Sequence, residues 1–404
     1  MLMRIGFRNV FRQKRRSLLT VLTMFGGFTL AAISIGWSDG TYSNIIEMFT
    51  RDRLGHIQVH HEGYLDRPSL YKTINDSEAV GAIISDIEGV EQWTPRVFSS
   101  GLASAGEKSA GVQIIGIDPA RESATTHFDK KIIRGRTFST EAAHEVVLGQ
   151  GLAEILKATL GDSVVIVSQG ADGSIANDIY ELVGLVDAGD KMTDQTAFYL
   201  HLHDAQELLV LKGRVHEIAI VAEDIKDVVD LAEVIQGKIS DPKLVVEPWQ
   251  VFARAFYQAM KADQQGTWIM LLLIMLVVAV GVLNTVLMTV LERTREFGVL
   301  RAVGTAPSQI IRLVIFEITV MAIIGIILGC GASYLVNYWL SIEGVALPTA
   351  FTYGGMEYDR MFTEINARSF YIPALTVLFS AMLVSIFPAI KAARIAPARA
   401  MRIR

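Results

Sequence analysis

The chain has 404 residues, of which 51% are hydrophobic and 20% are charged, with a formal net charge of −5 and a mean hydropathy of +0.37. This composition is too apolar for a soluble enzyme and too charged for a chain that lies wholly within a membrane. A single cysteine, Cys330, excludes a disulfide within the chain, so every folded part must be held together by packing.

Four apolar runs reach the length of about 20 residues that a helix needs to cross a hydrocarbon core of roughly 30 Å. They are residues 17–37, 267–291, 310–340 and 370–390. Residues 38–266 have an ordinary globular composition and are numerous enough for a core of their own. The sequence therefore predicts an α-helical membrane protein with four transmembrane helices and a large domain inserted between the first and second.

Lysine and arginine in the short flanks predict the orientation of the spans, because cytoplasmic segments are enriched in them. The N-terminal flank, the segment that joins the second and third spans with Arg312 at its edge, and residues 391–404 together carry 15 basic residues and two acidic ones. Residues 38–266 carry 20 basic and 35 acidic residues. We expect both termini to be cytoplasmic, and we expect the large domain and loop 341–369 to lie on the other side.

Two stretches of the large domain show a strand, a helix and a strand in succession. The first comprises residues 54–61, 76–87 and 92–103, and the second comprises residues 215–221, 224–239 and 243–246. These repeats predict one α+β subdomain built from both ends of the insert. The middle is expected to be mostly β, with a helix over 149–158 and a hairpin of 163–168 and 179–186 around Asp172-Gly173.

Two helical stretches border the insert, over residues 38–51 and 247–265. They are able to continue the neighbouring spans and to carry motion into the large domain, although burial alone would explain them equally well. Apolar residues at this level are candidates for a cargo-facing surface, and packing of the two stretches is the more frequent explanation of such residues. The candidates are Met48, Phe49, Phe256, Met260, Leu340 and Phe351.

A dense block of charge, residues 292–309, joins the second and third spans. Within it, Phe297, Leu300 and Gly304 lie at helical positions i, i+3 and i+7, with Val299 and Val303 beside them, while Glu292, Arg295 and Glu296 face elsewhere. A simple connector would not need an amphipathic helix. The pattern indicates a short helix on the membrane surface that presses against a partner.

This block, with the sequence E-R-T-R-E-F-G-V-L-R-A-V-G-T-A, resembles the coupling helix of the FtsX-like ABC transporter permeases (the MacB and LolC/LolE type, type VII). Residues 6–20 resemble the amphipathic N-terminal helix of that family, and residues 388–402 resemble its terminal pattern. The resemblance covers the whole chain, and residues 54–60 with Gly63-Tyr64 look more like the lipoprotein-releasing branch than the macrolide-exporting one.

The resemblance implies that the chain is the membrane subunit of an ABC transporter in the bacterial inner membrane, working as a dimer with two copies of a separate ATPase. The large domain would be a Porter subdomain (about 50–110 and 210–250) with a Sabre insert (about 110–205). ATP and Mg²⁺ would bind in the ATPase, and this chain would itself have no catalytic, cofactor or metal site. The residues implied to dock the ATPase are Glu292, Arg293, Arg295, Glu296, Phe297, Gly298, Leu300, Arg301 and Gly304.

Three functions are compatible with this resemblance. The leading one is ATP-driven extraction of a lipoprotein or another lipidated or hydrophobic cargo, with a periplasmic carrier or adaptor as a further partner. The second is efflux of small molecules or peptides through an adaptor and an outer-membrane duct. The third is a regulator that transports nothing and controls a cell-wall hydrolase or signals antibiotic stress.

Other chemistry has weaker support in the sequence. Residues 101–109 approach a phosphate-binding loop, but Glu107 stands where that loop requires lysine. His201 and His203 would share one face of a strand, yet no third metal ligand is evident, and Asp204 is expected to cap a helix over 205–211. In the third span, Glu317 is expected to pair with Arg312 or with an arginine of block 292–309 rather than to transport protons.

Overall fold

The structure is a computed structural model that describes residues 14–187, 189–353 and 356–395. The chain forms two compact units. The helical unit comprises residues 1–43, 260–347 and 360–404, and the sheet unit comprises residues 44–259 and 348–359.

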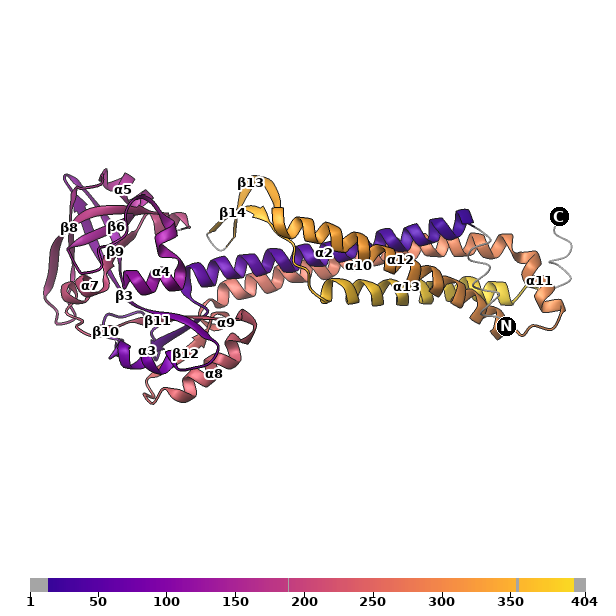
Figure 1. Cartoon of the computed structure of the whole chain (residues 1–404), viewed down its shortest axis with the longest axis horizontal. Coiled ribbons are helices and arrows are strands. Elements are labelled where there is room, and N and C mark those ends of the chain that lie inside the picture. Colours follow the sequence, from indigo (N-terminus) through magenta and orange to yellow (C-terminus); the bar gives the residue numbers. More distant parts are fainter. Residues whose placement is uncertain (1–13, 188, 354–355, 396–404) are drawn as a thin grey trace. The chain divides into compact units, whose positions relative to one another are not determined.

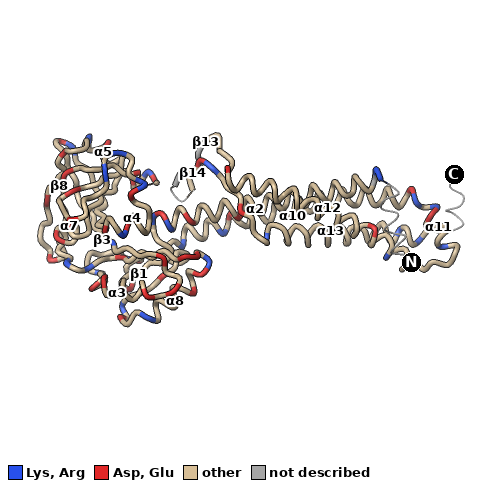
Figure 2. The backbone as a smooth tube through the Cα atoms, in the orientation of Figure 1, with Lys and Arg blue, Asp and Glu red and all other residues tan. Residues whose placement is uncertain are grey.

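Four long helices dominate the helical unit: α2 (Lys14–Phe49), α10 (Arg254–Glu292), α12 (Pro307–Glu343) and α13 (Arg368–Ala393). By length and composition all four are able to cross a membrane. Figure 1 shows them running alongside one another, and Figure 2 shows long stretches of them without a charged residue. Each helix is longer than the apolar run that predicted it, and α2 and α10 include most of the helical stretches predicted over residues 38–51 and 247–265.

Small residues allow α2 and α12 to approach closely. A Cβ atom added to Gly325 would lie 3.0 Å from the Cβ of Met24, and one added to Gly329 would lie 2.6 Å from the Cδ1 of Phe28. Met24 and Phe28 are fully buried. Gly325 and Gly329 of α12 therefore serve close packing within this chain.

The link between α10 and α12 contains a short helix, α11 (Thr294–Ala302). The predicted helix over 292–309 was too long. Gly304, with φ +98°, follows the end of α11, and Pro307 occupies the first turn of α12. A glycine in the left-handed region ends a helix, and a proline at the first helical position begins one, so these two residues fix the boundary.

A ten-stranded sheet forms the core of the sheet unit, in the order β12-β1-β11-β3-β4-β9-β6-β8-β5, with β7 pairing β3 and β8. Its strands are β1 (Ile57–His61), β3 (Val90–Ala105), β4 (Lys108–Ile117), β5 (Ile132–Gly135), β6 (Glu145–Gly149), β7 (Ser163–Gln169), β8 (Ile175–Val186), β9 (Ala197–His201), β11 (Glu217–Ala222) and β12 (Leu244–Pro248). Strands β2 (Ile74–Asn75) and β10 (Arg214–Val215) form a separate pair.

The helices of the sheet unit are short, and some begin with an acidic cap. They are α3 (Ser77–Ser85), α4 (Pro119–Thr126), α5 (Gln150–Leu156), α6 (Lys191–Asp194), α7 (Leu202–Leu208), α8 (Val228–Lys238) and α9 (Trp249–Phe252). Asp224 accepts a hydrogen bond from the backbone of Lys226 and so caps a 3-10 turn (Ile225–Asp227) that precedes α8.

The two strand-helix-strand repeats lie together as predicted: β1 and β12 from opposite ends of the insert are hydrogen-bonded neighbours. Their strands do not form a sheet of their own, because β3 is long enough to pair with β11 through residues 90–96 and with β4 through residues 96–105. One strand thus joins the α+β part to the mostly β part. The β7–β8 hairpin around Asp172-Gly173 is also confirmed.

Loop 341–369, between the third and fourth spans, contains a hairpin of β13 (Val345–Tyr353) and β14 (Met356–Met361). The predicted cap of α7 is wrong. Asp204 was expected to cap a helix, but α7 already begins at Leu202, and the side chain of His201 accepts the capping hydrogen bond from the backbone of His203. His201 and His203 therefore do not share a strand face.

Candidate functional site

A buried ion pair fixes α11 to the following long helix. Arg293, the residue between α10 and α11, donates from Nη1 to Oε2 of Glu317 on α12 at 2.6 Å and from Nε to Oε2 of Glu296 at 2.8 Å. The side chains of Arg293 and Glu317 are 6% and 8% exposed. The prediction that Glu317 pairs with an arginine of this block is confirmed, with Arg293 as the partner.

The apolar side of α11 packs into the helical unit. Phe297 is 1% exposed and belongs to a buried cluster with Val290 of α10 and Ile310 of α12. The guanidinium of Arg293 lies 5.0 Å from the centre of the Phe297 ring, and Leu300 packs against the same cluster. Phe297 and Leu300, which the sequence assigned to contact with a partner, therefore pack against other helices of the same chain.

The opposite side of α11 is exposed. Glu292, Arg295, Val299, Ala302 and Val303 follow one another at helical spacing and all are exposed. We call these five residues the exposed stripe. It mixes both signs of charge with two branched apolar side chains, Val299 at 48% and Val303 at 82% exposure, and this mixture suits contact with another protein.

The residues predicted to dock an ATPase divide between these two sides. Arg293, Phe297 and Gly298 are buried, so they hold the helix in place rather than contact a partner. Glu296, Leu300 and Arg301 are half-buried, whereas Glu292, Arg295 and Gly304 are exposed. Val299, Ala302 and Val303 were not among the predicted docking residues. Val299 and Val303 were expected beside the apolar positions, but the structure exposes both, because the helical spacing from Glu292 and Arg295 places them on the outer side.

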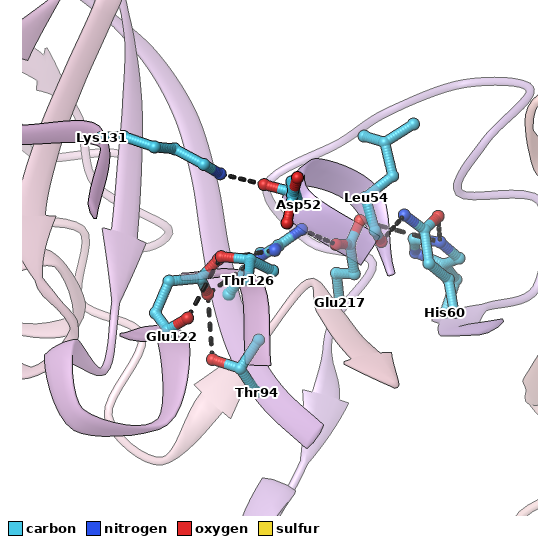
Figure 3. A network of polar contacts seen from close by, with 10 residues as sticks. Asp52, Leu54, His60, Thr94, Glu122, Thr126, Lys131 and Glu217 are labelled. Carbon is cyan, nitrogen blue, oxygen red and sulfur yellow. Dashed lines mark hydrogen bonds and ion pairs between the residues drawn. The ribbon is translucent and has the colours of Figure 1, made fainter. Parts of the chain in front are cut away.

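A second polar cluster lies within the sheet unit, around Arg96 of β3 (Figure 3). Arg96 binds both oxygens of Glu122, at 2.6 and 3.1 Å, and an oxygen of Glu217 at 2.9 Å. Thr94 and Thr126 donate to Glu122 as well, at 3.0 and 2.8 Å. The three charged residues come from β3, α4 and β11, so the cluster ties the α+β part of the sheet to the helix that follows β4.

Burial shifts the protonation of this cluster. It raises the pKa of the Glu217 carboxyl to about 7, against the opposing effect of Arg96. Burial would also raise the pKa of Glu122, but Arg96 and Thr126 outweigh it and hold that pKa below its usual range. Burial lowers the pKa of Lys131 to about 8, although Glu122 and Asp52 oppose the shift.

The segment that follows α2 makes contact with several parts of the sheet unit. It is a π-helical turn, Thr50–Leu54, and we call it the joint. Arg51 donates to Glu91 at the start of β3, and Asp52 accepts from Lys131 through its backbone oxygen (Figure 3). Arg53 pairs with Asp190 at 2.6 Å. A displacement of the end of α2 would therefore act on three separate segments of the sheet unit.

The joint and the cluster around Arg96 were missed from sequence. Arg96 stands in a stretch with strand alternation at a position facing inward, and a charge at such a position is the only local signal. Its partners are 26 and 121 residues away in the chain. Sequence spacing gives no means of pairing them.

The proposed cargo-facing residues are mostly packed within the chain. Phe49 and Phe256 are both 8% exposed, and their rings stack with centroids 3.8 Å apart in the sheet unit. Met260 and Leu340, in the helical unit, are 4% and 8% exposed. Met48 is half-buried, and the side chain of Phe351 lies outside the described residues. This arrangement favours the packing explanation.

Two other histidines of the sheet unit, His60 and His216, also have structural partners. His60 is buried and bonds through Nε2 to Gln58 at 2.9 Å, and burial lowers its pKa to about 4. His216 accepts at Nδ1 from the backbone of Phe98 at 3.0 Å. Among the residues that the structure describes, no three His, Cys, Asp or Glu side chains gather as metal ligands would.

Comparison with known families decides the identity of these units. Residues 17–238 match the MacB-like periplasmic core domain, and residues 268–397 match the FtsX-like permease C-terminal domain. The chain belongs to the FtsX-like permeases. The permease is thus an ABC transporter subunit of the LolC and MacB type, and its four apolar helices agree with an inner-membrane protein.

Individual relatives share little sequence with this permease. It is 22% identical to the lipoprotein-releasing system transmembrane protein LolC of Neisseria meningitidis serogroup B, with 98% of both chains covered. It is 23% identical to the macrolide export ATP-binding/permease protein MacB of Campylobacter jejuni, over 98% of this permease and 60% of that protein. The crystal structure of the periplasmic region of MacB from Actinobacillus actinomycetemcomitans aligns to 50% of the permease, with a TM-score of 0.38 and 16% identity.

Proposed function

We propose that this permease couples ATP hydrolysis by a separate ATPase subunit to a movement of its sheet unit on the other side of the membrane. The observation that carries this proposal is the construction of α11. Its inner side is locked to α12 by Arg293 and Glu317, and its outer side presents the exposed stripe. A force applied to the stripe would therefore move the long helices rather than bend the link.

The predicted orientation of the chain in the membrane supports transmission of movement from the cytoplasmic side to the sheet unit. α11 lies among the basic flanks that mark cytoplasmic segments, and the sheet unit is part of the acidic stretch between the first two spans. An ATPase in the cytoplasm would meet α11, and the sheet unit would lie in the periplasm with the α+β part as Porter and the mostly β part as Sabre. The joint would pass the motion of α2 into the sheet.

The cargo we propose is a lipoprotein or another lipidated or hydrophobic molecule of the inner membrane. Support comes from the LolC relatives, which match along 98% of their own length. The MacB relatives carry an ATP-binding part in the same chain, as their name states, and this permease covers 60% of one of them. We infer that this permease works as a dimer, with a second copy or a paralogue, and with two ATPase subunits that hold ATP and Mg²⁺.

Reversal of charge on the exposed stripe tests the coupling. We expect Glu292→Arg combined with Arg295→Glu, and separately Val299→Asp, to abolish co-purification of the ATPase and the stimulation of its activity. Glu343→Arg is the control, because Glu343 is equally exposed but lies at the far end of α12. Retention of ATPase binding and stimulation in both stripe variants would refute the docking role. Identification of lipidated molecules that co-purify with the complex tests the cargo separately.

A further inference from the structure

A lateral groove opens in the helical unit between three of the four long helices. It is a cavity of ≈ 170 Å³ with an almost wholly apolar lining. Its walls are Ala31 of α2, Leu271, Met275 and Val278 of α10, and Thr376 and Val377 of α13. The groove closes at Gly27, where an added Cβ would lie 2.0 Å from Cγ2 of Val278.

The length of the groove corresponds to one leaflet of a bilayer. It extends along α10 from Trp268 to Val278. Ten helical residues rise about 15 Å, which is half of a hydrocarbon core of roughly 30 Å. Since these helices cross the membrane, the medium beside the groove is lipid. The groove is therefore as long as one acyl chain within one leaflet. Such a chain would enter from the end of the helical unit opposite α11.

Charged and aromatic side chains lie at the mouth of the groove. A smaller pocket there shares Trp268, Leu271 and Ile372 with the groove and adds Asp39 and Arg368. Arg368 is 49% exposed, and its guanidinium carbon lies 5.5 Å from the centre of the Trp268 ring. Trp268, itself 50% exposed, suits the boundary between headgroups and hydrocarbon.

The two charges match the two charges of a zwitterionic headgroup. Nη1 of Arg368 lies 3.6 Å from Oδ1 of Asp39, too far for a hydrogen bond, so the exposed guanidinium has donors to offer a phosphate. Asp39 accepts from Asn366 through its other oxygen at 2.9 Å, which holds the carboxylate in place. A primary amine next to the phosphate would meet this carboxylate.

We propose that the groove binds a membrane phospholipid with a phosphate and a primary amine, of the phosphatidylethanolamine type. Its headgroup lies on Arg368 and Asp39, and one acyl chain fills the groove down to Gly27. The phosphate distinguishes this ligand from a lipidated cargo, whose diacylglyceryl anchor has none. The site does not depend on the proposed coupling, and its test uses no ATPase or cargo measurement.

The test uses the full-length permease complex in nanodiscs that contain phosphatidylethanolamine with a photoactivatable diazirine in one acyl chain. After illumination and proteolysis, we expect cross-links on residues 271–278 and 372–380. Thr376→Phe, which fills the groove, should reduce them at least threefold. Leu375→Phe is the matched control, because Leu375 is 48% exposed on the same helix and does not line the groove.

The headgroup is tested with Arg368→Gln, which we expect to reduce labelling roughly tenfold or more, the loss of a hydrogen bond to a charged group. Arg312→Gln near the start of α12 is the matched arginine control. Labelling unchanged by Thr376→Phe would overturn the groove as the site. Equal labelling by a diacylglycerol probe without phosphate would overturn the phospholipid as its occupant.

Discussion

Arg293 and Glu317, 24 residues apart in the chain, meet at 2.6 Å and are both nearly inaccessible to solvent. The pair joins the residue that precedes α11 to a turn inside α12. It explains why a segment rich in charge forms a fixed structure at the end of the helical unit. The charge that faces inward is neutralised there, whereas Glu292 and Arg295 are exposed at the surface.

Removal of one residue of the Arg293–Glu317 pair should lower the stability of the permease more than removal of both. We expect Glu317→Leu alone to destabilise the permease by about 3–5 kcal/mol, because it leaves a buried arginine without its main partner. The double variant Arg293→Met with Glu317→Leu should recover most of that stability. Thermal unfolding in detergent gives the stability, and ATPase stimulation gives the coupling. A double variant no more stable than the single one would show that the pair is not the main constraint.

The cluster around Arg96 should be the most sensitive polar site of the sheet unit. Arg96→Ala leaves Glu122 and Glu217 buried without their shared cation, and we expect a loss of about 3–5 kcal/mol. The matched control is Glu78→Ala, since Glu78 pairs with Arg121 at 2.8 Å but its side chain is 65% exposed. That pair should be worth about 1 kcal/mol or less. Equal effects of the two variants on thermal unfolding would show that the cluster around Arg96 contributes no more to stability than an exposed ion pair.

The stability of the sheet unit should depend on pH through Glu217. Its pKa is raised from 4.5 to about 7 in the folded chain, so its contribution is fully present below pH 4.5 and is lost as the pH rises through 7. His60, with its pKa lowered from 6.5 to about 4, acts in the opposite sense: its contribution is present above pH 6.5 and is lost as the pH falls through 4.

Glu217→Gln separates these two effects. It removes the contribution that falls with rising pH, so the unfolding midpoint of this variant should rise more steeply from pH 5 to pH 7 than that of the unmodified permease. Intrinsic tryptophan fluorescence on the full chain provides the measurement, because Trp93 and Trp249 belong to the sheet unit. Parallel pH profiles for the two proteins would mean that Glu217 does not titrate in this range.

The joint should affect the transmission of movement from α2 to the sheet unit more than the assembly of the permease with its ATPase. We expect Arg51→Gln combined with Arg53→Gln to retain the ATPase and its basal activity, because α11 is untouched. The response of the ATPase to cargo should fall severalfold, because α2 would lose its polar contacts with Glu91 and Asp190. Arg67→Gln is a control at an exposed position of the same unit. A normal response to cargo in the double variant would remove the joint from the proposed path of force.

Several features of this permease could be read from short-range patterns. The four long helices follow from apolar runs of spanning length, and the β7–β8 hairpin follows from alternation around Asp172-Gly173. The boundary between α11 and α12 also has local signals in Gly304 and Pro307, although the predicted helix ran past them. Each of these features depends on residues within a few turns of one another.

Other features depend on residues that are distant in the chain. Phe297 was assigned to a partner because a helical stripe shows only that one side is apolar, not what covers it; the structure shows α10 and α12 covering it. In the same way, the pairing of Arg96 with Glu217 exists because β3 and β11 are neighbours in the sheet. Local spacing therefore determined the elements and the apolar sides of the helices. Tertiary packing alone decided which charges are neutralised inside the chain and which remain exposed to a partner.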